Sequence, residues 1–155
     1  MHAVDALRHI AGDVAEADIR TLRRTGEFAA WYAIDLQFEN GVSGRIDVLP
    51  TAGVLEETYE LMGEGFRAVV RCPFGPRRAW RCYRENRTVI EETYDGMPEE
   101  LLNGCYDEAA EFIRALIHKE SPHPPIADVF PSVRLCLELA KIVGQAAGSL
   151  APARS

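Results

Sequence analysis

His2 and Asp5 are the residues whose types and spacing best suit chemistry. They stand three positions apart in residues 2–11, a segment with helical apolar spacing, so both side chains should lie on one side of a helix. A histidine exchanges protons near neutral pH, which the oxidation of a hydroxyl to a carbonyl requires. The alternative is a histidine near a chain end that has no role. Taken alone, the pair favours this alternative.

A second chemical pattern lies in the centre of the chain. Residues 63–68 match the dinucleotide fingerprint G-x-G-x-x-A, in which glycines let backbone amides meet a pyrophosphate at a helix N-terminus. The fingerprint requires a helix directly after it, but residues 69–73 are strand-like and end in a proline. We therefore predict a hairpin turn here. A helix beginning at Phe66 would instead favour dinucleotide binding.

Composition limits the classes of partner and the compartment. The net charge of −7 argues against nucleic acid or an anionic membrane as the main partner. The sequence has no signal peptide and no apolar run of membrane-spanning length. The four cysteines form no C-x-x-C pair and no metal-binding spacing, which is typical of a reduced cytoplasmic protein. The 155 residues are enough for one domain.

The pattern along the chain predicts strands first and helices afterwards. After a helix over 2–11 that ends at Gly12, alternating apolar residues predict strands over 14–23 and 27–39, and Asn40-Gly41 predicts a hairpin to the strand after it. Further strands are predicted at 55–62, 66–73, 79–85 and 88–94.

Two helices are predicted in the last third of the chain. The first has an apolar face from Leu101 to Ile117. The second is capped by Asp128 and has an apolar stripe of Val133, Cys136, Leu137, Ala140, Val143 and Ala147. We expect an α+β domain over 1–147, with a largely antiparallel, open-faced sheet and helices packed on one face, followed by a flexible tail over 148–155.

The open face of the predicted sheet is a candidate interface. Ala29, Trp31 and Ala33 alternate with the core-facing residues of their strand, and an apolar open face usually meets a partner. We expect a homo-oligomer through this face. The alternative is that these are scattered apolar surface residues, which are common.

Several segments together resemble the C-terminal domain of the Gfo/Idh/MocA oxidoreductases, which include glucose–fructose oxidoreductase and inositol dehydrogenases. Residues 2–14 resemble its H-x-x-D-x-x-x-x-x-x-G opening, and residues 36–44 resemble its F-x-N-G-x-x-G hairpin. Residues 59–65 are similar to its G-x-x-G turn, with one residue fewer between the glycines. The later matches are residues 106–113, similar to an E-x-x-x-F-I/V helix, and residues 124–129, similar to a proline–acidic helix entry.

The resemblance implies a dihydrodipicolinate reductase-like domain that binds substrate and forms the oligomer of an NAD- or NADP-dependent sugar or polyol oxidoreductase. In that family a separate Rossmann domain carries the cofactor, so we expect none to bind this chain alone. The D-x-x-x-H motif of the family is matched only at its histidine, His2, which implies a proton-handling role. Asp5 matches a recurrent aspartate that has a structural role or contacts substrate.

Three hypotheses about function stay open at this stage. The helix over 2–11 has neither a capping residue nor a lead-in loop, which indicates the second half of a larger enzyme that is inactive without its cofactor domain. A stand-alone, non-catalytic dimerising module derived from the family fits the same residues. A small-ligand domain unrelated to the family is the third.

Overall fold

The computed structural model describes residues 1–24, 30–74 and 77–148, with the side chains of 145–148 excepted. It is an α+β structure that divides into two compact units. The first comprises residues 1–51 and the segment that begins at Pro124, and the second comprises residues 52–123. The second unit is thus an insertion within the sequence of the first. The single sheet that we expected is two sheets, one in each unit.

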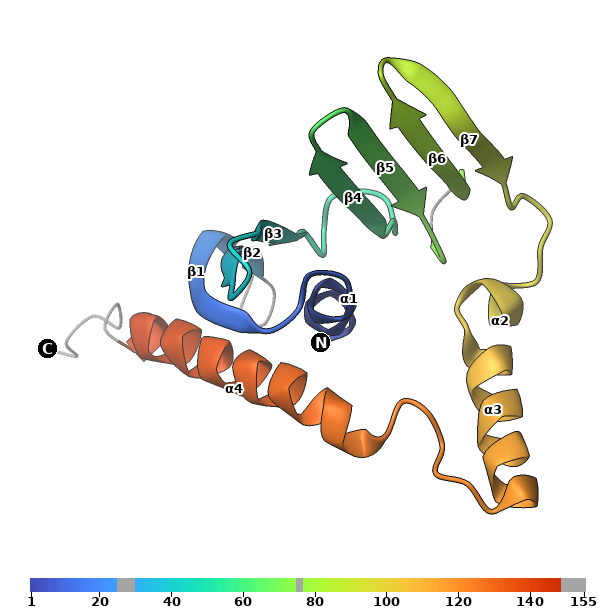
Figure 1. Cartoon of the computed structure of the whole chain (residues 1–155). Coiled ribbons are helices and arrows are strands. Elements are labelled where there is room, and N and C mark those ends of the chain that lie inside the picture. The colour runs from blue at the N-terminus through green and yellow to red at the C-terminus, as the bar shows by residue number, and fades with distance from the viewer. Residues whose placement is uncertain (25–29, 75–76, 149–155) are drawn as a thin grey trace, which may run out of the picture. The chain divides into compact units, whose positions relative to one another are not determined.

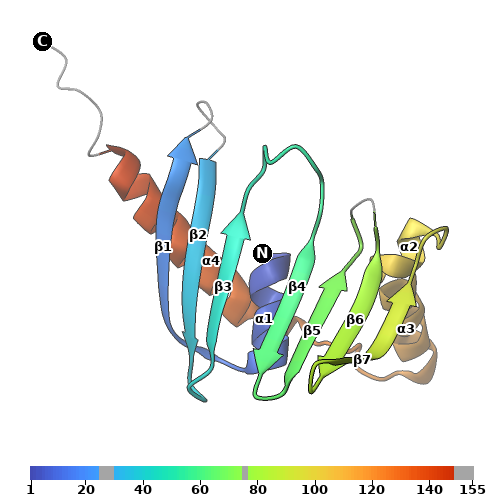
Figure 2. The same cartoon turned by 90° about the horizontal axis from the view of Figure 1, so that it is seen from above.

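The first unit is a three-stranded antiparallel sheet with two helices. Helix α1 (His2–Ala11) is followed by β1 (Val14–Arg24), β2 (Ala30–Phe38) and β3 (Ser43–Val48), which pair in the order β1-β2-β3. Helix α4 (Ile126–Gly148) runs behind these three strands, as Figure 2 shows. The predicted hairpin is confirmed, with Gly41 at the positive φ of 85° that glycine adopts without a steric penalty.

The core of the first unit lies between this sheet and its two helices. Alternation along β2 directs Ile34, Leu36 and Phe38 to one face, where they meet Val4 of α1 and Leu139 of α4. Ile46 of β3 pairs with Ile34 and belongs to the same cluster. The prediction that helices pack on one face of an antiparallel sheet is confirmed for this unit. The finer assignment to a dihydrodipicolinate reductase-like fold stays a proposal.

The second unit is a four-stranded antiparallel meander followed by two helices (Figure 1). Its strands are β4 (Thr58–Gly63), β5 (Phe66–Arg71), β6 (Ala79–Arg84) and β7 (Arg87–Thr93). The helical segment that we predicted as one continuous stripe from Leu101 is broken into α2 (Glu99–Leu102) and α3 (Cys105–His118). Gly104, at a φ of 77°, separates the two helices.

The apolar face predicted for this segment exists, but it is not buried. Ala115 is the buried residue of α3, whereas five large apolar side chains of this helix are more than half exposed, namely Tyr106, Phe112, Ile113, Leu116 and Ile117. The second unit therefore leaves an amphipathic helix with its apolar side uncovered.

Candidate functional site

Helix α1, which bears both predicted site residues, is fixed to α4 by a hydrogen-bonded polar cluster. Val4 is buried against the sheet, and one residue further the carboxylate of Asp5 accepts a hydrogen bond of 2.6 Å from the hydroxyl of Ser132 in α4. Arg8 donates to the same hydroxyl at 2.8 Å and forms an ion pair with Asp13 at 2.6 Å. Because Ser132 is fully buried and the Arg8 side chain is 13% exposed, these groups need one another as partners.

His2 and Asp5 have different environments in the structure. His2 is exposed at the start of α1, whereas Asp5 is half-buried and bonded to Ser132. The two stand one turn apart on the helix, as predicted. Asp5 therefore has a structural partner within the chain, and His2 is the member of the pair whose imidazole is open to solvent.

An apolar cavity of about 420 Å³ lies in the first unit beside the start of α1. Met1, which precedes α1, and Ala3 and Val4 of α1 line it, whereas the His2 side chain is not part of its wall. Its remaining walls come from the inner face of the sheet and from α4, and the side-chain polar groups among the lining residues are the Tyr32 hydroxyl and the Cys136 thiol. The cavity therefore suits an apolar group better than the hydroxyls of a sugar.

The outer face of the same sheet is charged rather than apolar. Arg20 pairs with Asp35 at 2.6 Å, and Arg45 pairs with Asp47 at 3.0 Å and with Asp35 at 3.7 Å. The expectation of an open apolar face is therefore wrong for the centre of this sheet. The strand pairing explains this charged surface, because it places arginines and aspartates of β1 and β3 beside the outward-facing residues of β2.

The three predicted interface residues have different environments. Ala33 is fully buried within the chain, so the expectation that it presents an apolar surface is wrong. Trp31 is half-buried: its indole donates to Thr51 at 2.9 Å, and the guanidinium of Arg23 lies 5.7 Å from its ring centre. Ala29 lies outside the described residues.

A second polar cluster, which sequence reasoning missed, lies at one end of the four-stranded sheet. The Tyr59 hydroxyl donates to the carboxylate of Glu57, and burial together with this bond raises the pKa of the tyrosine far above its usual range. The neighbouring Cys72 donates to the carbonyl of Leu102 at 3.3 Å, and burial raises the pKa of its thiol although Arg78 acts in the opposite direction. A thiol held in its neutral form is a poor nucleophile, so this cluster does not resemble a cysteine active site.

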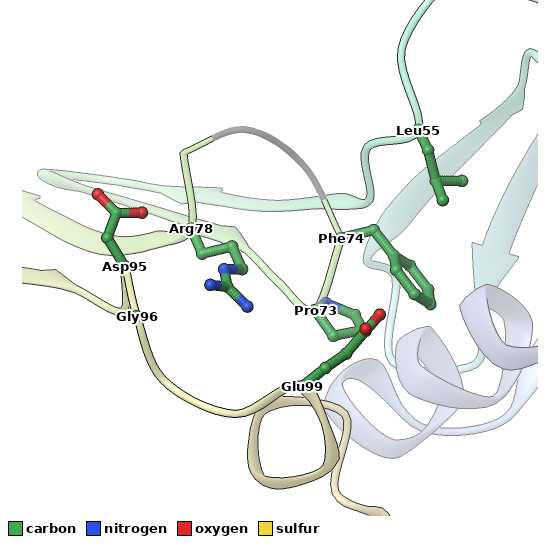
Figure 3. Close-up of a pocket in the computed structure, with 7 residues that line it drawn as sticks. All are labelled: Leu55, Pro73, Phe74, Arg78, Asp95, Gly96 and Glu99. Carbon is green, nitrogen blue, oxygen red and sulfur yellow. The ribbon is translucent and has the colours of Figure 1, made fainter.

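Arg78 also lines an open cavity of about 340 Å³ next to this cluster (Figure 3). Its guanidinium donates to the carbonyl of Met97 at 3.4 Å, and the side chains of Asp95 and Glu99 contribute negative charge to the cavity wall. The carboxylates offset the charge of the arginine. The cavity therefore lacks the excess of positive charge that a phosphate or another anion would require.

The fingerprint at residues 63–68 does not fit a dinucleotide. Strand β4 ends at Gly63 and β5 begins at Phe66, so the glycines form the turn of an antiparallel hairpin, as predicted. A Cβ at Gly63 would lie 2.1 Å from the Phe66 ring, which explains the glycine by packing. All strand pairings of the described residues are antiparallel, whereas a dinucleotide site of this type needs a parallel βαβ unit.

Further searches of the described residues and of known proteins give no functional assignment. Across residues 1–24, 30–74 and 77–148 there is no cluster of three or more potential metal ligands. Nor does any described helix have the length and apolar character needed to cross a membrane. Comparison with protein-family models, curated proteins and solved structures finds no match.

Proposed function

We propose that the chain is a substrate-binding and oligomerisation domain of the kind found in NAD(P)-dependent sugar or polyol oxidoreductases. The observation that carries the proposal is the position of His2 at the exposed start of a helix that Val4, Asp5 and Arg8 fix to the rest of its unit. A proton-handling group needs such a fixed support, because misplacement by about 1 Å can cost ~100-fold in rate. The Gly12 helix stop and the Asn40-Gly41 hairpin, both at the positions that the family resemblance implies, add support.

The role proposed for this chain does not include hydride transfer. Residues 63–66 form a hairpin turn rather than a dinucleotide site, so in this proposal NAD or NADP would be held by a separate domain of the complete enzyme. His2 would accept or donate the proton of a substrate hydroxyl at an imidazole nitrogen. Asp5 would act indirectly, by keeping the helix in place through Ser132.

Calorimetric titration of the chain tests the proposal. We expect myo-inositol or glucose to bind at the exposed start of α1, outside the apolar cavity, and His2→Ala to weaken binding by about tenfold through the loss of one hydrogen-bonding group to a hydroxyl. His9→Ala, at the exposed far end of the same helix, is the matched control and should leave affinity unchanged. Absence of binding to either compound would contradict the substrate-binding role.

Titration with NADH and NADPH tests the cofactor part of the proposal separately. We expect no heat of binding from the chain alone. Saturable binding of either nucleotide would show that our rejection of residues 63–68 is wrong, and would also contradict the resemblance to a domain that leaves the cofactor to its neighbour.

A non-catalytic dimerising module is the alternative, and the exposed apolar side of α3 favours it. Oligomerisation through the outer sheet face can be tested at Trp31, the described apolar residue of that prediction that is still partly accessible. If this face forms the interface, Trp31→Glu should convert an oligomer into monomers in a sedimentation experiment. An unchanged mass would exclude the outer sheet face.

A further inference from the structure

The apolar cavity between the three-stranded sheet, α1 and α4 has no role in the proposed function. Its volume of about 420 Å³ lies within the range of about 300–1,000 Å³ that is usual for small-molecule sites. An apolar cavity of ~150 Å³ already holds a benzene ring, so this one has room for a ligand of nearly three times that size. Well-packed cores contain few voids larger than a water molecule. The cavity is therefore a candidate binding site of the first unit.

The walls of this cavity are mainly aliphatic. Ile34 and Ile46 line it from two neighbouring strands, and Leu139 and Val143 line it from α4. Tyr32 is the aromatic residue among the described lining residues, so an aromatic ligand would find little to stack against. An alkyl chain would instead bury its surface against branched aliphatic side chains.

The cavity follows one side of α4 over more than two turns. Its lining residues there are Cys136, Leu139, Ala140, Val143 and Gly144, whose spacing of i, i+3, i+4, i+7 and i+8 places them on one face of the helix. They extend over about 12 Å along the helix axis. A partner helix about 10 Å wide would occupy roughly 900 Å³ over this length, which is more than twice the cavity volume. A single alkyl chain is long and thin enough to fit both the length and the volume.

The two ends of the cavity differ in exposure. Ile34 pairs with Ile46 across the strands, and each is 8% exposed. Two residues along the strands Tyr32 pairs with Val48, which is 41% exposed. The cavity is thus closed at the isoleucine pair and open at the Tyr32–Val48 pair, where the tyrosine hydroxyl can hydrogen-bond to a polar group. A ligand with an apolar chain and one polar end matches this arrangement.

A carboxylate is the polar end that the surroundings of Tyr32 favour. Ala30 and Tyr32 alternate onto the same face of β2, and Arg24 is the cross-strand partner of Ala30. An arginine on this face would attract a carboxylate. We propose that the cavity binds a medium-chain fatty acid, with its alkyl chain along α4 and its carboxylate at the exposed end beside Tyr32. This site is separate from the proposed function, because the sugar would bind at the start of α1, outside the cavity.

Calorimetric titration with hexanoate, octanoate and decanoate tests the proposal. We expect one decanoate per chain, and an affinity that rises about fourfold for each added methylene, the increment that burial of a methylene in an apolar site produces. An affinity that does not change with chain length would overturn the proposal. Tighter binding of 2-naphthoate, a two-ring aromatic acid, would overturn the assignment to an alkyl chain.

Ala140→Phe tests whether the chain occupies the cavity. Ala140 lines the cavity from an exposed position of α4, so the added ring should take up the space of at least two methylenes and weaken decanoate binding about tenfold. Ala127→Phe is the matched control, because Ala127 is exposed on the same helix and does not line the cavity. Equal affinities of the two variants would place decanoate elsewhere.

Tyr32→Phe tests the position of the carboxylate. This variant keeps the ring in the cavity wall and removes the hydroxyl, so we expect decanoate to bind about fivefold more weakly through the loss of one hydrogen bond. Tyr83→Phe makes the same change in the second unit and should leave the affinity unchanged. An affinity unchanged in Tyr32→Phe would show that the carboxylate does not lie at this end.

Isoleucine methyl spectra of the unaltered chain give a test that does not depend on the folding of a variant. Ile19, Ile34 and Ile46 line the cavity, whereas Ile113 and Ile117 are exposed on α3. Decanoate should shift the methyl signals of the first three and leave those of the other two unchanged. Shifts confined to the α3 isoleucines would show adsorption to an exposed apolar surface, and would overturn the proposal.

Discussion

At the scale of single residues, the buried hydroxyl of Ser132 connects helices α1 and α4 of the first unit. It donates to Asp5 and accepts from Arg8, and so joins a charge of each sign across two helices that are distant in sequence. Two charged groups near the interior need such a partner, because an unpaired polar group there costs about 1–3 kcal/mol, and a charged one more.

We therefore expect Ser132→Ala to lower the free energy of unfolding by about 2 kcal/mol, since it leaves Asp5 and Arg8 without their shared hydroxyl. Urea unfolding measures this change. Ser43→Ala is the control, because Ser43 exchanges hydrogen bonds with Gln37 at an exposed position of β3 and its loss should cost little. Equal costs for the two variants would show that the cluster is not a stabilising contact.

Tyr59 should make the free energy of unfolding depend on pH, and the direction of its raised pKa determines the sign of that dependence. Its pKa in the folded chain is raised by burial and by the bond to Glu57, so the unfolded chain loses this proton first as the pH rises. The stabilising contribution is complete below pH ~10, the ordinary pKa of tyrosine, and falls above it. Tyr59→Phe should flatten the loss of stability between pH ~10 and ~11, whereas Tyr83→Phe on β6, which is separated from β4 by β5, should not. A parallel decline in both variants would contradict the assignment to Tyr59.

The environments of individual residues were only partly predictable from the sequence. That His2 and Asp5 stand one turn apart could be predicted because both lie within one helix, where spacing determines which side chains are neighbours. The partner of Asp5 lies 127 positions away, in a helix whose rotation about its own axis is set by packing. The cluster of Glu57, Tyr59 and Cys72 could have been proposed from strand alternation combined with pairing, but the strand pairing was not known.

At the scale of elements, the sequence pattern predicted wrongly which side of helix α4 faces the core. The predicted stripe included Leu137, which is 59% exposed, and omitted Leu139, which is 4% exposed and belongs to the core. The helix also begins at Ile126, two residues before the predicted cap Asp128, so Pro131 lies inside it. Because α4 is apolar on more than one side, several rotations satisfy its sequence equally well, and contact with Val4 and Leu36 selects one.

The two leucines therefore form a matched pair for a test of this rotation. Leu139→Ala should lower the free energy of unfolding by about 2–5 kcal/mol, the usual cost of emptying a core leucine site. Leu137→Ala should change it by less than about 0.5 kcal/mol, as exposed substitutions do. Chemical denaturation of both variants distinguishes the rotations, and a larger effect at Leu137 would restore the predicted stripe.

The first helix, the strands and the hairpins were predicted more accurately than the helices of the last third of the chain. Period-two alternation and turn residues such as Asn40-Gly41 are local signals, so they place a strand and its partner without knowledge of the rest of the fold. These local signals do not determine how the strands are grouped into sheets. The β3–β4 connection is not a hairpin, and the boundary between the two units at residue 51 follows from it.

At the scale of the whole molecule, the two units differ in how much apolar surface they bury. The hydrophobic core cluster belongs entirely to the first unit. In the described part of the second unit, Ala79 and Ala115 are the buried apolar residues. Since burial of apolar surface is the main stabilising contribution to folding, the two units should differ in local stability.

Native-state hydrogen exchange tests this difference and its link to ligand binding. Without added ligand we expect the slowest amides in β2 and faster exchange throughout β4–β7, because the smaller core of the second unit allows opening at lower free energy. If the cavity of the first unit binds a fatty acid as proposed, decanoate should slow exchange in β2 further, since a ligand that binds the folded state stabilises it by mass action. Amides of β5 serve as the internal control, because local opening of the second unit should not respond to this ligand. Equal protection of both units at every ligand concentration would show that the second unit is stable without a partner. This result would contradict the expected difference in local stability.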